Sequence, residues 1–159
     1  MIGTSIDERI EGIDESVPVH GKFDLIHWRN GKKIFQSTEQ NLVVNTGKVQ
    51  IPKLVNGLSS AFFNYIQIGL ATNTPSLEDT HLYSAYMEGL AICSYGADYK
   101  AIFDYIFAFT ESKTITEAGV FNGSYGSVPA PIMLCRGTFA GRPVVPGDNL
   151  EVKWRTTFG

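Results

Sequence analysis

Residues 149–158 show the most regular alternation of apolar and polar side chains in the sequence. One set of alternate positions holds Leu150, Val152, Trp154, Thr156 and Phe158, and the other set holds Glu151, Lys153, Arg155 and Thr157. Successive side chains of a strand point to opposite faces of a sheet, so this period of two predicts a strand with one buried and one solvated face. Trp154 lies in the middle of the apolar face, and we expect it to be a structural anchor of the core.

Shorter patterns of the same kind predict further strands along the chain. The first two flank Asn30-Gly31, a pair that favours a two-residue hairpin turn because both central residues need a positive φ. Gly, Pro and Asn residues lie between the strand-like segments that follow. The expected strands are 23–28, 33–36, 64–70, 87–97, 99–110, 114–121, 132–140 and 149–158.

The strand expected at 99–110 is apolar on both of its faces. Phe103 and Phe107 fall on one face, and Ile102 and Ile106 fall on the other. A strand that is apolar on both sides is typical of a central position covered twice, so we expect it inside its sheet. Ile102 and Ile106 are therefore candidates for contacts with another protein.

Within residues 17–159, only residues 48–57 favour a helix. Asn45 or Thr46 is the expected N-cap, and Gly57 the expected end. Pro52 is compatible with a helix only within the first turn, where its missing N–H needs no partner. The sequence thus predicts a mainly β fold, a β-sandwich or jelly-roll-like domain over 17–159 with one short helix.

Residues 1–16 precede this domain, and we predict that they form an acidic N-terminal arm. Acidic side chains outnumber the single Arg9, and Ile2, Ile6, Ile10 and Ile13 recur at intervals of four, four and three. Such spacing lines one side of a short helix, and an extended strand laid along a neighbour is the alternative. Either conformation predicts that these four isoleucines contact a partner during assembly.

Composition narrows the classes of function. The net charge is −3 and Lys and Arg form no cluster, which argues against binding to nucleic acid. The apolar segments are too short to span a bilayer, and residues 1–8 lack the features of a signal peptide. Charged residues make up 18% of the chain, below the usual quarter or so of a soluble domain, which is typical of a surface partly covered by other protein.

No residue pattern predicts catalysis or a bound cofactor. Glu111 and Glu117 could serve as a carboxylate pair for glycoside hydrolysis, but we favour a structural role for Glu117, whose carboxylate would accept N–H groups from a loop. The loop 73–80 has too few carboxylates for calcium, and the three histidines are far apart in sequence. Cys93 and Cys135 could form a disulfide, although two buried thiols are the favoured interpretation.

The tyrosines are the basis for an alternative function, glycan binding. An exposed row of aromatic side chains would indicate a glycan-binding module for host attachment, whereas aromatics in the core or at subunit contacts would argue against it. The tyrosines are Tyr65, Tyr83, Tyr86, Tyr95, Tyr99, Tyr105 and Tyr125. We expect most of them in the core or at an interface.

Five segments in order carry a resemblance to a known group of proteins. They are the segments 41–47, 65–69, 115–122, 134–139 and 146–154, which read NLVVNTG, YIQIG, ITEAGVFN, LCRGTF and PGDNLEVKW. Together they resemble small structural proteins of tailed bacteriophages, of the tail-fibre, collar or head-decoration type, over residues 22–158. Pro52, inside the expected helix, departs from that pattern.

The resemblance implies a non-enzymatic virion protein without a cofactor, made in the cytoplasm of a bacterial host. Its expected partners are other virion proteins, namely capsid, portal or neck, or tail components. Head decoration or a collar is favoured over a tail-fibre or baseplate adaptor, because the chain lacks a repetitive shaft. A homo-oligomer is expected, with a trimer preferred, and neither nucleic acid nor membrane is an expected partner.

Overall fold

The computed structural model describes residues 17–159, and this part of the chain folds into ten strands and one α-helix. The elements are β1 (Val19–Arg29), β2 (Lys32–Gln40), β3 (Leu42–Val43), α1 (Asn45–Val55), β4 (Tyr65–Gly69), β5 (Ala85–Leu90), β6 (Ile92–Gly96), β7 (Lys100–Ala108), β8 (Lys113–Phe121), β9 (Met133–Val144) and β10 (Asn149–Phe158). The prediction of a mainly β domain with a single short helix is confirmed for these residues.

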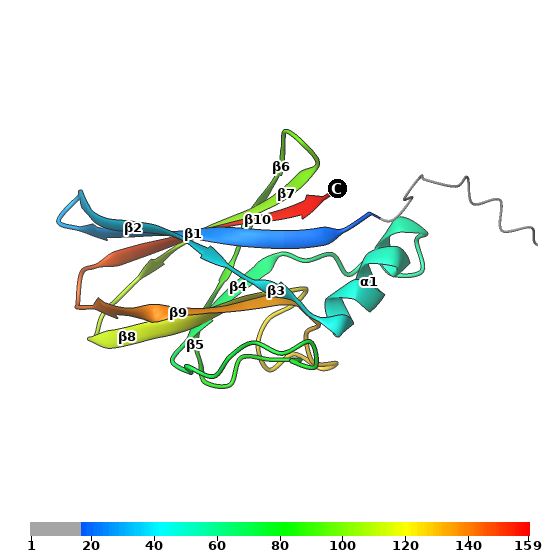
Figure 1. Cartoon of the computed structure of the whole chain (residues 1–159). Helices are drawn as coiled ribbons and strands as arrows, with labels where there is room; N and C mark the ends of the chain where they lie inside the picture. The colour runs from blue at the N-terminus through cyan, green and yellow to red at the C-terminus, as the bar shows by residue number, and fades with distance from the viewer. Residues whose placement is uncertain (1–16) are drawn as a thin grey trace, which may run out of the picture.

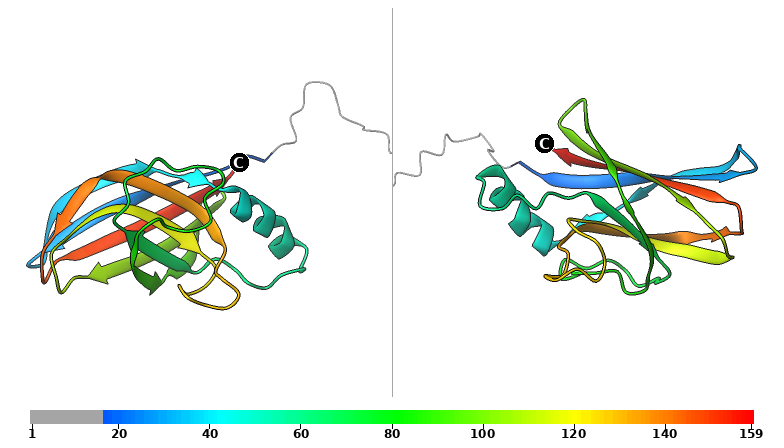
Figure 2. Two further views of the ribbon diagram at one scale, coloured as in Figure 1. Left: turned by 90° about the horizontal axis from the view of Figure 1, so that it is seen from below. Right: turned by 180° about the vertical axis from the view of Figure 1, so that it is seen from behind.

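The strands form two antiparallel five-stranded sheets that lie face to face as a β-sandwich (Figure 1). Sheet A has the order β2-β1-β10-β7-β6, and sheet B has the order β3-β9-β8-β4-β5. Helix α1 lies at one end of the sandwich, and the β4–β5 and β8–β9 loops lie on the outer side of sheet B (Figure 2).

The hairpin at Asn30-Gly31 forms as the sequence predicts. Asn30 has φ 52° and Gly31 has φ 74°, so both central residues adopt the left-handed conformation that this turn requires. β1 also pairs along its whole length with β10, from Val19 opposite Phe158 to Trp28 opposite Asn149. The first and last strands of the domain are therefore neighbours at the centre of sheet A.

The core lies between the sheets and is rich in aromatic side chains. Trp154 is fully buried and stacks on Phe23, its cross-strand neighbour, with ring centroids 4.2 Å apart. Gly137 of β9 faces this pair, and a Cβ there would lie 2.4 Å from the Phe23 ring. The absence of a side chain at residue 137 thus leaves the space that the stacked rings fill.

Helix α1 begins three residues earlier than predicted, and its N-cap is Val44 rather than Asn45 or Thr46. Both polar side chains have other partners, because the Asn45 amide donates to Glu78 and the Thr46 hydroxyl donates to the carbonyl of Met133. Pro52 consequently lies inside the helix and not in its first turn. The expected positions of the N-cap and of Pro52 were wrong.

The expected strand 87–97 is two strands in different sheets. β5 belongs to sheet B and β6 to sheet A, and the chain crosses between them at Ala91.

β7, expected to be central and covered on both faces, is the second strand from the edge of sheet A. Phe103 and Phe107 face the core, whereas Ile106 is exposed on the outer face, so only one face of β7 is covered within the described chain.

Two further expectations concern the cysteines and the arm. Cys93 and Cys135 are both free thiols, and Cys135 is buried as expected, but Cys93 on the edge strand β6 is exposed. The arm candidates Ile2, Ile6, Ile10 and Ile13 lie outside the described residues.

Candidate functional site

The outer face of sheet B carries a buried cluster of charged side chains beneath the β4–β5 loop. Ile66, Ile68, Ala118 and Val120 point into the sandwich core, so the residues that alternate with them in β4 and β8 face outward. Glu117 of β8 lies opposite Gly69 of β4. A Cβ at residue 69 would lie 2.4 Å from Glu117 Oε1, so Gly69 makes room for the carboxylate.

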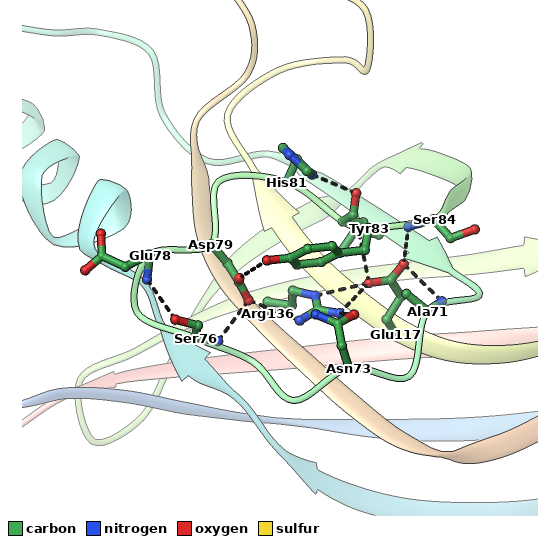
Figure 3. Close-up of polar contacts among 11 residues, drawn as sticks. Ala71, Asn73, Ser76, Glu78, Asp79, His81, Tyr83, Ser84, Glu117 and Arg136 are labelled. Atoms are coloured by element: carbon green, nitrogen blue, oxygen red, sulfur yellow. Dashed lines mark hydrogen bonds and ion pairs between the residues drawn. The ribbon is translucent and has the colours of Figure 1, made fainter.

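Glu117 holds the two ends of the β4–β5 loop against the sheet (Figure 3). Its Oε1 accepts the backbone N–H of Ser84 at 2.8 Å and that of Ala71 at 3.3 Å. Its Oε2 accepts the backbone N–H of Tyr83 at 3.3 Å. This fully buried carboxylate therefore binds three N–H groups of the loop, one at its start and two at its end.

Arg136 of β9 is the cation of the cluster. Its Nε and Nη2 donate to Glu117 Oε2 at 3.1 and 2.8 Å, and its Nη1 donates to Asp79 Oδ2 at 3.1 Å. Nη2 also donates to the side-chain oxygen of Asn73 at 3.0 Å. The guanidinium is fully buried, and its fixed fork binds two carboxylates that come from different parts of the chain.

Asp79 and Tyr83 close the cluster from the loop side. Asp79 Oδ2 accepts the N–H of Ser76 and Oδ1 accepts the Tyr83 hydroxyl, both at 2.9 Å. Burial raises the pKa of Asp79, but the hydrogen bonds from Ser76, Tyr83 and Arg136 outweigh it, so the pKa lies below its usual value. The Tyr83 ring covers the Arg136 guanidinium at 4.8 Å, as Figure 3 shows, and its hydrogen bond to Asp79 raises the pKa of Tyr83.

Both oxygens of Glu117 and both oxygens of Asp79 already accept hydrogen bonds, so the cluster is arranged to fix the loop. Glu111, the other carboxylate considered for catalysis, is exposed and accepts the Tyr86 hydroxyl at 2.7 Å. Glu111 and Glu117 share no hydrogen-bond partner among the described residues. Asp79 and Asn73, considered as calcium ligands, both bind Arg136 instead.

A second buried cluster lies where the β1–β2 hairpin meets the β9–β10 turn. Asp148 Oδ1 and Oδ2 accept Arg29 Nε at 2.8 Å and Nη2 at 2.9 Å, and Oδ2 lies 2.8 Å from His27 Nε2. Arg142 Nε donates to His27 Nδ1 at 2.9 Å, so the proton of a neutral His27 is on Nε2 and is donated to Asp148. The bonds from Arg29 hold the pKa of Asp148 well below its usual value, although burial opposes this.

Beside the Arg136 cluster, the two loops over sheet B enclose a groove of about 600 Å³, here called the tyrosine groove. It is lined by Gln67, Thr80, His81, Leu82, Tyr83, Phe121, Tyr125, Gly126, Ser127, Ala130 and Pro131. Leu82 and Phe121 form part of a small apolar cluster on the outer face of sheet B, and Gln67 of β4 also lines the groove. The groove lies outside the sandwich core and opens to solvent between the loops.

The remaining predicted site residues lie apart from this groove. Ile102 and Ile106 are on the outer face of β7 in sheet A, and Trp154 is in the core. The sequence pattern did not identify Arg136, Asp148 or Gln67 as site residues. A lone cation inside an otherwise apolar strand, as at Arg136 in 133–137, is the signal that could have indicated a buried ion pair.

No group of three potential metal-binding side chains occurs within residues 17–159. Among the same residues, no helix has the length and apolar character needed to cross a bilayer. Comparison of the chain with family models, with curated proteins and with solved structures finds no match.

Proposed function

We propose that this protein is a non-enzymatic structural component of a tailed-phage virion that binds other virion proteins and further copies of itself. The proposal rests on the resemblance described above and on one structural observation, the uncharged open edge of sheet A at β6. Strand edges offer unpaired N–H and C=O groups, and proteins that remain monomeric usually protect them with charged residues, Pro or a covering segment.

β6 lacks this protection within the described chain. It pairs only with β7, and its sequence Ile92–Gly96 contains neither a charged residue nor a proline. Ile92 is 75% exposed and Tyr95 is 76% exposed. The opposite edge strand, β2, carries Lys32, Lys33 and Glu39. The two edges of one sheet therefore differ in the feature that normally prevents strand pairing between molecules.

Further exposed apolar side chains lie near helix α1. Those of Val49, Val55, Leu58 and Phe62 are exposed. An apolar groove of about 350 Å³ runs between the helix and sheet A and is lined mainly by aliphatic and aromatic side chains, including Leu54, Phe103 and Phe158. Apolar surface of this kind is typical of a binding face for another protein.

Within the virion, we favour head decoration or a collar, with a tail-fibre or baseplate adaptor as the alternative placement. The partners would be capsid, portal or neck, or tail proteins, and the self-association would give a homo-oligomer, for which we prefer a trimer. Residues 1–16 would provide a further contact. The described chain starts beside its own C-terminus, where the Gly159 N–H donates to the Pro18 carbonyl at 2.9 Å.

Charging the β6 edge tests the proposal. Ile92→Lys combined with Ser94→Lys adds two cations to β6 and should convert the oligomer to a monomer in light scattering and reduce binding to particles that lack the protein. Ile34→Lys, compared with the single change Ile92→Lys, is the matched control, because Ile34 is an exposed apolar residue on the charged edge strand β2. A wild-type protein that is monomeric at tens of micromolar and does not bind such particles would refute the proposal.

Deletion of residues 1–16 tests the arm separately. We expect the truncated protein to retain the β-sandwich, judged by its far-UV circular dichroism and its unfolding midpoint, and to bind particles more weakly. Truncated protein that decorates particles as tightly as the full chain would remove the assembly role of the arm while leaving that of β6 intact.

A further inference from the structure

We propose that the tyrosine groove on sheet B is a binding site for a neutral carbohydrate. It adjoins a smaller hollow of about 190 Å³ lined by Gln67, Tyr86, Met87, Glu88 and Tyr125, among others. Gln67 and Tyr125 line both spaces. The combined site is within the usual size range of ligand pockets and is separate from the assembly edge β6, which lies in the other sheet.

Gln67 is the observation that points most directly to a ligand. The residue is only 2% exposed, and its side-chain amide forms no hydrogen bond with any other described residue. The amide is not fully enclosed, so it faces the groove and is open to water in the free protein. The amide can donate and accept, and a sugar hydroxyl can do the same, so a carbohydrate bound in the groove would satisfy it.

Tyr83 and Tyr125 supply aromatic surfaces at the same site. Tyr83 is 56% exposed and Tyr125 is 70% exposed, although both line a concavity. An aromatic ring of this kind presents an apolar face that packs well against the C–H face of a sugar ring. Neither tyrosine is in the core, and their exposure favours the glycan-binding alternative for this part of the surface.

The Tyr83 ring and the backbone of Tyr125 are held in place before any ligand binds. The Tyr83 hydroxyl donates to Asp79, its N–H donates to Glu117, and one face of its ring covers Arg136. The N–H of Tyr125 donates to the Glu88 carboxylate at 2.7 Å, and the Ser124 hydroxyl donates to the same carboxylate. Binding would then require little ordering of the loops, which favours affinity.

The charge of the lining selects the class of sugar. None of the residues that line the tyrosine groove is Asp, Glu, Lys or Arg, and the charged residue that lines the adjoining hollow, Glu88, is an anion. Arg136, the nearby cation, is fully buried and bound to Glu117 and Asp79. Acidic sugars would therefore find no counter-charge, whereas a neutral sugar needs only hydroxyl partners and aromatic faces.

The test uses the full chain on an array of neutral and acidic glycans, followed by saturation-transfer NMR and calorimetry with each glycan retained. We expect binding to one or more neutral glycans and a roughly tenfold loss of affinity in Tyr125→Ala, the amount expected for one aromatic contact. Tyr95→Ala, which removes an equally exposed tyrosine from β6, is the control and should bind as the wild type does.

Gln67→Leu separates a binding role from a structural one. This change keeps the approximate size of the side chain and removes the amide that faces the groove, so we expect loss of glycan binding with an unfolding midpoint no lower than that of the wild type. An unchanged affinity or a lower unfolding midpoint would overturn the proposal.

Three other results would also overturn it: absence of binding across the array, binding confined to acidic glycans, and equal losses of affinity in Tyr125→Ala and Tyr95→Ala. The Tyr125→Ala protein should still decorate particles as the wild type does. Failure of glycan binding and failure of assembly are therefore distinguishable.

Discussion

The two buried charged clusters use the same kinds of side chain in opposite arrangements. In the Arg136 cluster a fully buried cation binds two buried carboxylates, Glu117 and Asp79. In the Asp148 cluster the buried group is the anion, and its main partner, Arg29, has a side chain that is 42% exposed. Charges removed from water depend on their partners much more than charges that keep part of their hydration. The first cluster should therefore be far less tolerant of substitution than the second.

Replacing Arg136 should have the largest effect. Arg136→Met keeps an unbranched side chain of similar length but leaves Glu117 and Asp79 buried without their cation, and loss of one partner from a buried ion pair typically costs about 3–5 kcal/mol. We expect a destabilisation of that order in urea denaturation. A loss below about 1 kcal/mol would mean that the cluster is hydrated in solution and would end the contrast between the two clusters.

Glu117→Gln should rank second. The amide keeps one acceptor oxygen for the N–H groups of Ser84 and Ala71 but removes the charge that Arg136 binds, so we expect a loss of about 2–3 kcal/mol. Protease sensitivity of the β4–β5 loop should rise as well, because Glu117 holds both ends of that loop.

Since we propose a non-enzymatic role, wild type, Glu117→Gln and Glu111→Gln should all release no sugar from host cell-wall preparations, and release by the wild type alone would contradict that role.

The third prediction concerns Asp148 and pH. Its pKa is lowered in the folded protein, so the stability it contributes is present above its ordinary pKa near about 4 and is lost as the pH falls further. Asp148→Asn should cost about 1–2 kcal/mol at pH 7. The difference in unfolding free energy between wild type and variant should shrink steadily below about pH 4. A difference that does not change with pH would show that Asp148 acts through its shape and not its charge.

Arg29→Met should have the smallest effect. Asp148 would keep its contact with His27 and would still accept the N–H of Val145 at 3.0 Å, and the side chain of Arg29 is partly in water already. We expect a loss below about 1 kcal/mol that diminishes further at high salt. Equal losses in Arg29→Met and Arg136→Met, measured side by side, would remove the distinction drawn between the clusters.

Much of the fold could be predicted from local patterns because local physics determines those parts. The alternation in 149–158 is the alternation of burial in β10, and Asn30-Gly31 specifies its turn through the backbone alone. The crossing at Ala91 could not be predicted in this way. Residues 87–97 contain no proline and no obvious break in their apolar character, and the change of sheet depends on which strand each half pairs with.

The candidate site was harder to predict because its parts meet only through tertiary structure. Glu117 was identified as a structural anchor for a loop, but its cation, Arg136, is 19 residues away, and Asp79 is 57 residues from that arginine. Gln67 appears in the sequence as one polar residue within a short apolar strand. The groove above it is made by two loops, and the path of the β4–β5 loop depends on these same ionic contacts, so no periodic pattern could reveal it.

The place of β10 within sheet A has a consequence for synthesis. β10 lies between β1 and β7, so these two strands have no bridge between them until residues 149–158 have been made. A nascent chain that ends earlier would present two facing open strand edges, the kind of surface that pairs with other chains. Folding of sheet A must therefore wait until β10 has been made, and a ribosome that stalls before Asn149 would leave a chain prone to aggregation.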